Sequence, residues 1–127
     1  KKTGKPVCVI DLDTIMPGIV LSDFGDMVRT FTNSTLEDEV NLSNVVMRMP
    51  IYQAMHEGFL SACGKVLTSL EMENLSIAGP WITLMQAMRF LTDYLRGDVY
   101  YKIKYPEHNL VRTRNQLTLF KSMLSQL

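Results

Sequence analysis

Most of the chain carries the hydrophobic period of amphipathic helices. Apolar residues recur every three or four positions, the spacing of one helix face, over residues 51–63, 81–95 and 110–124. An earlier helix is expected to start at the cap residues Ser22 and Asp23 and to end at Asn33. The pattern therefore predicts a mostly α-helical chain.

Residues that start and stop helices divide this pattern further. Pro50 and Gly64 bound the first long apolar stripe. Thr68 and Glu71 have the spacing of a capping box, in which a hydroxyl and a carboxylate satisfy the free backbone N–H groups at a helix start. The sequence Ala-Gly-Pro at 78–80 is expected to end that short helix, because proline removes a backbone donor.

The second half of the chain has its own boundaries. Gly97 should end the helix over 81–95, and residues 98–104 are aromatic and irregular. Pro106 prevents continuation, so a final helix is expected from His108 onward. Residues 35–44 are polar and are predicted to form a surface connection.

The start of the chain has a different pattern. Residues 7–10, Val-Cys-Val-Ile, favour β structure and follow the turn-forming sequence Gly-Lys-Pro at 4–6, as a strand leaving a hairpin would. The partner strand would lie upstream, and an exposed strand edge favours pairing with another copy or domain swapping. The expected fold is therefore mostly α, with a short N-terminal β-strand or hairpin remnant.

Size, charge and cysteine content limit the possible classes of protein. The 127 residues suffice for one domain over 1–127 with one core. Thirteen basic and thirteen acidic residues cancel, so no long-range field attracts nucleic acid or an anionic membrane. No apolar run approaches the roughly 18 residues of a membrane span. Cys8 and Cys63 lack metal-site spacing, and a reduced, cytoplasmic location is expected.

The candidate chemistry lies in Val9-Ile10-Asp11-Leu12-Asp13. A buried strand that ends in carboxylates delivers oxygen ligands to a rim, where they can hold Mg²⁺ against nucleotide phosphates. We assign Asp11 to the metal. Asp13 points to the same side of an extended strand and could hold a second ion directly or through water. The alternative is that both carboxylates form a solvated strand end.

An Ile-Asp pair after an apolar strand, then Gly18, then Asp23 opening a helix, resembles the metal-binding segment of kinases of the aminoglycoside phosphotransferase and choline kinase superfamily. Further on, Thr-Asp-Tyr-Leu at 92–95 and Gly-Asp-Val-Tyr-Tyr at 97–101 are similar to the C-terminal region of N-acetylhexosamine 1-kinase-like members. The resemblance covers nearly the whole chain. It implies a mostly helical C-lobe fragment of a protein-kinase-like fold, derived from an α+β parent.

The resemblance also implies roles for individual residues. Asp11 matches the magnesium aspartate, and Asp23 matches an aspartate that braces the catalytic loop through hydrogen bonds. The intact enzyme would use ATP and Mg²⁺ to phosphorylate a hydroxyl of a small molecule, an amino sugar in this branch. An ordinary cap role at a helix start is the alternative for Asp23.

Arg89 and Tyr100 are the candidate substrate-binding residues. A charged fork and a hydroxyl could converge on a polar sugar and its phosphate. The alternative is a buried salt bridge between Arg89 and Asp93 with a packed tyrosine ring. Trp81 is expected to be a core anchor, and the Arg112-x-Arg114 pair is expected on a solvated helix face.

Important parts of the kinase pattern are not found in these 127 residues. The family's His-x-Asp-x-x-x-x-Asn loop, which supplies the catalytic base, does not occur here, and neither does a phosphate-binding GxxxxGK[ST] motif. No catalytic base is therefore assigned within the chain, and the nucleotide-binding lobe would lie upstream. Because phosphoryl transfer depends on complete positioning and charge stabilisation, negligible activity is expected from this polypeptide alone.

Two other readings stay open. A choline- or aminoglycoside-type kinase would need an acidic or aromatic cage for a cationic substrate, which could come from Asp93, Asp98, Tyr100 and Tyr101. A non-catalytic helical interaction module would instead use exposed helical faces, or the strand edge, to bind a partner or a second copy.

Overall fold

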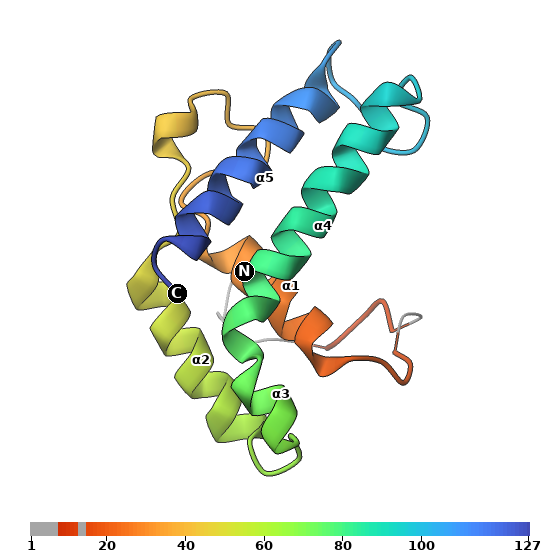
Figure 1. The fold of residues 1–127 in the computed structure, drawn as a ribbon. Coiled ribbons are helices and arrows are strands. Elements are labelled where there is room, and N and C mark those ends of the chain that lie inside the picture. The colour runs from red at the N-terminus through yellow and green to blue at the C-terminus, as the bar shows by residue number, and fades with distance from the viewer. Residues whose placement is uncertain (1–7, 13–14) are drawn as a thin grey trace.

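The computed structural model describes residues 8–12 and 15–127. Its helical elements are α1 (Val20–Thr32), the short 3-10 helix η1 (Leu42–Asn44), α2 (Met49–Cys63), α3 (Ser69–Glu73), α4 (Leu75–Leu95) and α5 (His108–Leu124). Figure 1 shows α4 and α5 side by side, with α1 crossing α4 and with α2 and α3 at the other end. The prediction of a mostly helical chain is confirmed.

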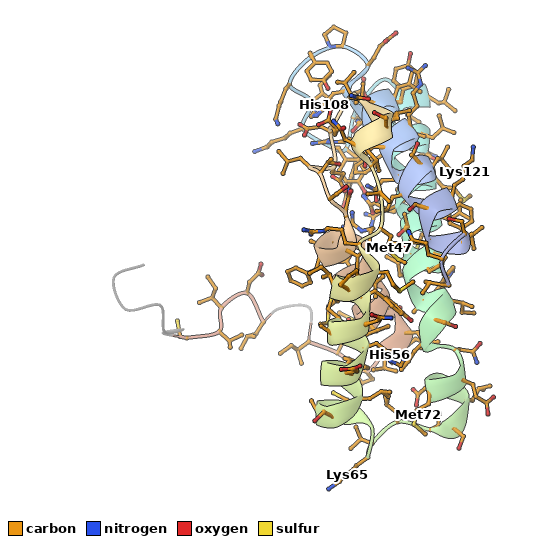
Figure 2. All side chains as sticks on the ribbon, turned by 90° about the vertical axis from the view of Figure 1, so that its left-hand side faces the viewer. Met47, His56, Lys65, Met72, His108 and Lys121 are labelled. Atoms are coloured by element: carbon orange, nitrogen blue, oxygen red, sulfur yellow. The ribbon has the colours of Figure 1, made fainter. Side chains whose placement is uncertain are left out.

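The strand predicted over residues 7–10 is not found in its described part, residues 8–10. Residues 8–12 are exposed and lie away from the helical body (Figure 2). Asp11 has a backbone φ of 64°, which does not belong to an extended strand. In the described part of the chain, β pairing is limited to an isolated bridge between Asn33 and Met47. A strand without a neighbour leaves its backbone groups unpaired, so the segment does not form one here.

Several helix boundaries follow local chemistry as predicted. α2 has proline in its first turn and is capped by Gly64. Thr68 and Glu71 form the capping box at the start of α3. α1 ends at Asn33 as expected but begins earlier, since the backbone N–H of Ser22 already donates to the carbonyl of Ile19. Ser22 therefore lies inside the first turn of α1 and does not cap it.

The expected stop at Ala78-Gly79-Pro80 is wrong, because α4 runs through Pro80 as one helix of 21 residues. Proline inside a helix removes one hydrogen bond and clashes with the preceding turn. At this place burial offsets that cost, since Ala78, Gly79 and Pro80 are all buried in the fold. A methyl group on Gly79 would lie 2.5 Å from Val28 of α1, so the glycine permits the close crossing of the two helices.

The same crossing depends on a second glycine. A methyl group on Gly25 of α1 would lie 2.6 Å from the Ile82 side chain and still closer to the backbone carbonyl of Ala78. The core around this contact consists of fully or nearly fully buried side chains from α1, α4, α5 and the segment before α2, including Phe24, Val28, Met47, Leu75, Leu119 and Met123. Trp81 is not part of this core, because 44% of it is exposed.

The connection from 33 to 48 is fixed to α5 by polar contacts. The Asn115 side chain donates to the backbone carbonyls of Leu36 and Glu39. Asp38 accepts hydrogen bonds from Lys104 and His108, and Figure 2 shows His108 at the opposite end of the helical body from Lys65. None of the helices in the described ranges is long and apolar enough to cross a membrane.

Candidate functional site

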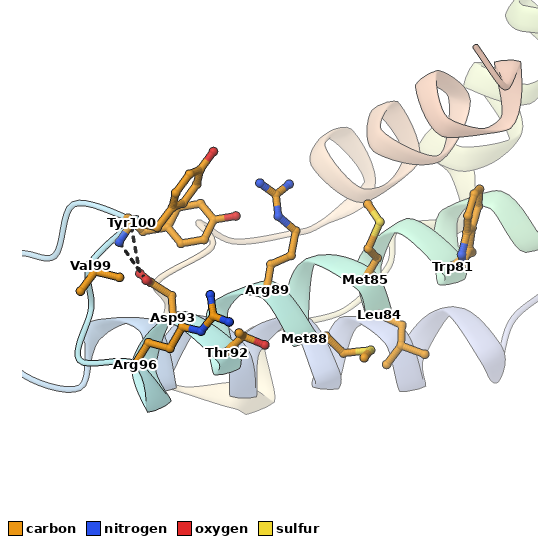
Figure 3. A pocket seen from close by; sticks show the side chains of 11 residues that line it. Trp81, Leu84, Met85, Met88, Arg89, Thr92, Asp93, Arg96, Val99 and Tyr100 are labelled. Carbon is orange, nitrogen blue, oxygen red and sulfur yellow. Dashed lines mark hydrogen bonds between the residues drawn. The ribbon is translucent and has the colours of Figure 1, made fainter.

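A hollow on the described surface runs along α4. We call it the α4 groove. Its volume is about 770 Å³. Residues of α4 and of the turn that follows it line the groove: Trp81, Leu84, Met85, Met88, Arg89, Thr92, Asp93, Arg96, Val99, Tyr100 and Tyr101. Figure 3 shows these residues.

Asp93 organises the turn that closes one end of the groove. Its two carboxylate oxygens accept the backbone N–H groups of Tyr100 and Tyr101 at 2.8 and 2.9 Å, and the Asn109 amide donates to it at 3.0 Å. Asn109 also donates to Asp98 at 2.8 Å. The chain turns back directly after α4 because Gly97 adopts a φ of 87°, the left-handed conformation that glycine favours after a helix. Tyr100 is thereby fixed beside the groove.

These contacts also determine the charge of Asp93. Only 4% of the residue is exposed, and this burial acts to raise the pKa of its carboxyl. The hydrogen bonds from the backbone of Tyr101 and Tyr100 and from Asn109 outweigh burial, so the pKa lies below its ordinary value. Asp93 is therefore an ionised acceptor for the turn, and its oxygens are already occupied.

Arg89 lies within cation–π distance of Tyr100. Its guanidinium carbon lies 5.9 Å from the ring centre of Tyr100 and 5.7 Å from that of Tyr101. The salt bridge with Asp93, considered as an alternative from the sequence, does not form, because that carboxylate is bound to the turn. Tyr100 itself is 72% exposed, so its ring is not packed in the core. The structure thus brings the two candidate substrate-binding residues together at the groove (Figure 3).

The groove is a poor acidic cage for a cation. Asp93 and Asp98 are the carboxylates that such a cage would use, and both are engaged in the turn. The guanidinium groups of Arg89 and Arg96 line the same groove. This arrangement disfavours an acidic cage for choline or an aminoglycoside at this place; an aromatic cage from Tyr100 and Tyr101 is a separate possibility that these carboxylates do not decide.

Asp11, a candidate metal residue, lies in the segment before α1 and is not part of the α4 groove. Asp11 is exposed and makes no side-chain hydrogen bond or ion pair with other described residues. Asp13 lies outside the described residues. Mg²⁺ is commonly held by one or two carboxylates together with water and nucleotide phosphates, so the carboxylate of Asp11 fits that donor set. Within 8–12 and 15–127, the structure brings no three His, Cys, Asp or Glu side chains together as a metal site.

Asp23 is exposed in the first turn of α1. Its negative charge is stabilising there because the N-terminal end of a helix is electropositive. Among the described residues its side chain has no hydrogen-bond partner, so the predicted bracing of a catalytic loop stays a prediction.

Two further polar contacts were missed from the sequence. His108 is fully buried between Asp38 and the backbone of Lys104. Because that backbone N–H can only donate, Nδ1 of His108 accepts it, and Nε2 donates to Asp38. Arg112 is not on a solvated face, since its side chain is 17% exposed and lies 5.3 Å from the ring centre of Phe90. His108 and Asp38 are 70 positions apart, so the local sequence gives no sign that they are in contact.

No family model matches this chain. The likeness to small-molecule kinases therefore rests on the motifs around Asp11, Asp23 and residues 92–101.

Proposed function

We propose that this chain is the C-terminal part of an ATP-dependent small-molecule kinase that phosphorylates a hydroxyl of an N-acetylhexosamine. The observation that carries the proposal is the pairing of Arg89 with Tyr100 at the mouth of the α4 groove. A planar cationic donor and a neutral hydroxyl at adjacent positions can bind the oxygens of a sugar and its phosphate. This pair supplies both, in the segment whose sequence resembles the sugar kinases.

Each candidate residue has a role in this proposal. Arg89 would donate to hydroxyl or phosphate oxygens, and the Tyr100 hydroxyl would orient the sugar ring. Asp11 would hold Mg²⁺, with Asp13 as the candidate for a second ion, and Asp23 would support the catalytic loop. Bound Mg²⁺ would neutralise charge on the phosphates of ATP.

The chain alone is expected to be inactive. It contains no His-x-Asp-x-x-x-x-Asn loop, so a base for the sugar hydroxyl must come from outside these residues. We also propose a reducing compartment such as the cytoplasm, where the thiols of Cys8 and Cys63 would stay unpaired. We therefore propose that the reaction requires an upstream lobe in the same compartment.

The test compares this chain with a version extended upstream through a nucleotide-binding lobe. Phosphate transfer from ATP is measured on N-acetylhexosamines, choline and aminoglycosides. We expect turnover only in the extended form and only with the amino sugars. Arg89→Gln should raise its KM for the sugar about tenfold or more by removing a charged hydrogen bond, whereas Arg114→Gln on α5 should leave KM unchanged.

Two outcomes would count against this function. Turnover by the 127-residue chain itself would refute the claim that it is incomplete. A folded extended form that is inactive on every substrate would refute the sugar-kinase assignment.

A helical interaction module is the second candidate, and a specific observation favours it. The side chains of Val9, Ile10, Ile15 and Met16 are all at least two thirds exposed, and water disfavours such an apolar group. Light scattering over a range of concentrations distinguishes the readings. A particle mass that rises with protein concentration supports the interaction module. A mass that stays at the monomer value shows that the chain does not associate with itself.

A further inference from the structure

We propose that the α4 groove binds an anionic small molecule with an apolar body about the size of an aromatic ring system. The inference goes beyond sugar phosphorylation and does not depend on it, although the two share Arg89. Four features of the groove support it: two arginines without an ion-pair partner among the described residues, a carboxylate whose oxygens are bound to the following turn, an exposed apolar wall, and the volume of the groove.

The positive charge comes from Arg89 and Arg96. Arg89 donates only to Gln86, at 3.5 Å, and otherwise lies over tyrosine rings. Arg96 makes no side-chain hydrogen bond with any described residue, and neither arginine forms an ion pair within the described ranges. Guanidinium forks of this kind bind carboxylate, sulfonate or phosphate through paired N–H groups.

No lining carboxylate among the described residues forms an ion pair with these arginines. Asp93 is the acidic residue among the groove residues, and its oxygens accept the N–H groups of Tyr100 and Tyr101 and the Asn109 amide. A cation entering the groove would meet two guanidinium groups and an occupied carboxylate. An anion would meet two donors that have no other acidic partner in the described structure.

The wall beside these arginines is apolar. Trp81, Leu84, Met85 and Met88 follow the i, i+3, i+4, i+7 spacing of one face of α4. Figure 3 shows Trp81, Met85 and Arg89 projecting from the same side of the helix. Trp81 offers a flat aromatic surface, and methionine side chains adapt to ligands of different outline. The ligand should therefore join its anionic group to an apolar, ring-containing body.

The size and the charge of the groove favour a small molecule. Its volume of about 770 Å³ falls in the range of roughly 300–1,000 Å³ typical of small-molecule clefts. A second copy presenting the same face would bring two more arginines against the first two. The lining ends at the turn of residues 99–101, so the groove covers one face of the second half of α4 and suits a compact ligand.

The chain contains a natural reporter for the test. Trp81 is its single tryptophan, so tryptophan fluorescence arises from the groove alone. The anionic probe is 8-anilinonaphthalene-1-sulfonate. The matched uncharged probe is N-phenyl-1-naphthylamine, which has the same aromatic body without the sulfonate. Titration of the full chain with each probe follows energy transfer from Trp81.

We expect the sulfonate probe to bind more tightly than the uncharged one. Arg89→Gln and Arg96→Gln should each weaken sulfonate binding on the order of tenfold by removing a charged donor, and should leave binding of the uncharged probe unchanged. Arg114→Gln, an exposed arginine of α5 outside the groove, is the control for net charge. Leu84→Glu should weaken both probes, because it places a charge in the apolar wall.

The proposal fails if both probes bind equally tightly, or if Arg114→Gln weakens the sulfonate probe as much as Arg96→Gln does. It also fails if the chain forms a dimer that the probe dissociates, since the groove would then belong to a second copy. Circular dichroism shows whether each variant is folded. If Arg89→Gln does not fold, the comparison of Arg96→Gln with Arg114→Gln decides the test. No ATP or sugar is present, so the result is independent of the kinase assignment.

Discussion

At the scale of single residues, Asp93 shows how one buried carboxylate can build a site without touching a ligand. Tyr100 reaches the groove because its backbone N–H is held by Asp93. A backbone N–H group cannot move by a change of side-chain rotamer. A hydrogen bond from it to the Asp93 carboxylate therefore fixes the turn more firmly than a contact between two side chains would. The position of Tyr100 beside Arg89 therefore depends on Asp93, which does not itself face a ligand.

Replacing Asp93 tests this dependence. Asp93→Asn removes the negative charge and replaces one acceptor oxygen with an NH₂ group, which cannot accept a hydrogen bond from the backbone N–H of Tyr100 or Tyr101. The turn should therefore loosen. We expect a Tm several degrees lower and exchange of the Tyr100 and Tyr101 amides on the order of tenfold faster. Glu73→Gln, an exposed carboxylate of α3, is the control. Unchanged exchange at both tyrosines would contradict the role given to Asp93.

Sequence reasoning succeeded at this scale where the chemistry is local. The capping box of Thr68 and Glu71 and the stop at Gly64 each involve residues at most four positions apart, so spacing alone predicts them. Asp93 was weighed as a salt-bridge partner of Arg89 because the two are one helical turn apart. The tyrosine amides compete better, since the turn at Gly97 brings them to the carboxylate, and the sequence does not show that return.

At the scale of elements, the crossing of α1 and α4 determines the architecture. The crossing is close because Gly25 and Gly79 have no side chains to separate the helices. This contact also explains why Pro80 fails to end α4. Local propensity predicts a break, but the buried contact with α1 stabilises the continuous helix. The sequence could not reveal this, because the partner helix lies about fifty residues earlier.

A pair of glycine substitutions tests the crossing. Gly25→Ala should lower the free energy of unfolding by about 1–3 kcal/mol, because the added methyl group meets the backbone of Ala78, which cannot move aside easily. Gly58→Ala is the matched change in α2, where nothing lies within 4 Å of the added methyl group. It should raise that free energy by up to about 1 kcal/mol, because alanine favours the helix. Urea denaturation measures both, and equal effects would contradict the crossing model.

At the scale of the whole molecule, the polar contacts around Asp38 hold the 33–48 connection against α5. The Lys104 side chain lowers the pKa of Asp38, burial opposes this, and the hydrogen bond from His108 lowers it further. The fold class was predictable from periodicity, since amphipathic stripes require helices that share a core. The docking of this connection was not, because its contacts join residues far apart in the chain.

Acid should weaken this docking. Because the folded-state pKa of Asp38 lies below its ordinary value of 3.8, its contribution to stability is present above that value. The contribution is lost as the pH falls through the lower, folded-state pKa. Asp38→Asn should therefore lose less stability than the unmodified chain as the pH falls from about 5, through the ordinary value of 3.8, to below the folded-state pKa. Urea denaturation at each pH measures this, with Glu57→Gln as the exposed control; parallel curves for Asp38→Asn and the unmodified chain would contradict it.

The close contact between α1 and α4 also sets an order for events on the ribosome. Synthesis proceeds from the N-terminal end, so α1 and α2 emerge first, and Tyr52 and Phe59 of α2 can already pack against Phe24. The residues of α4 and α5 that complete the burial of Phe24 and Val28 have not yet been made. Ala78 follows much later, and Leu119 and Met123 of α5 later still. The nascent chain must therefore present these apolar side chains to chaperones or to water until α4 has left the exit tunnel, and its core closes only after α5 has followed.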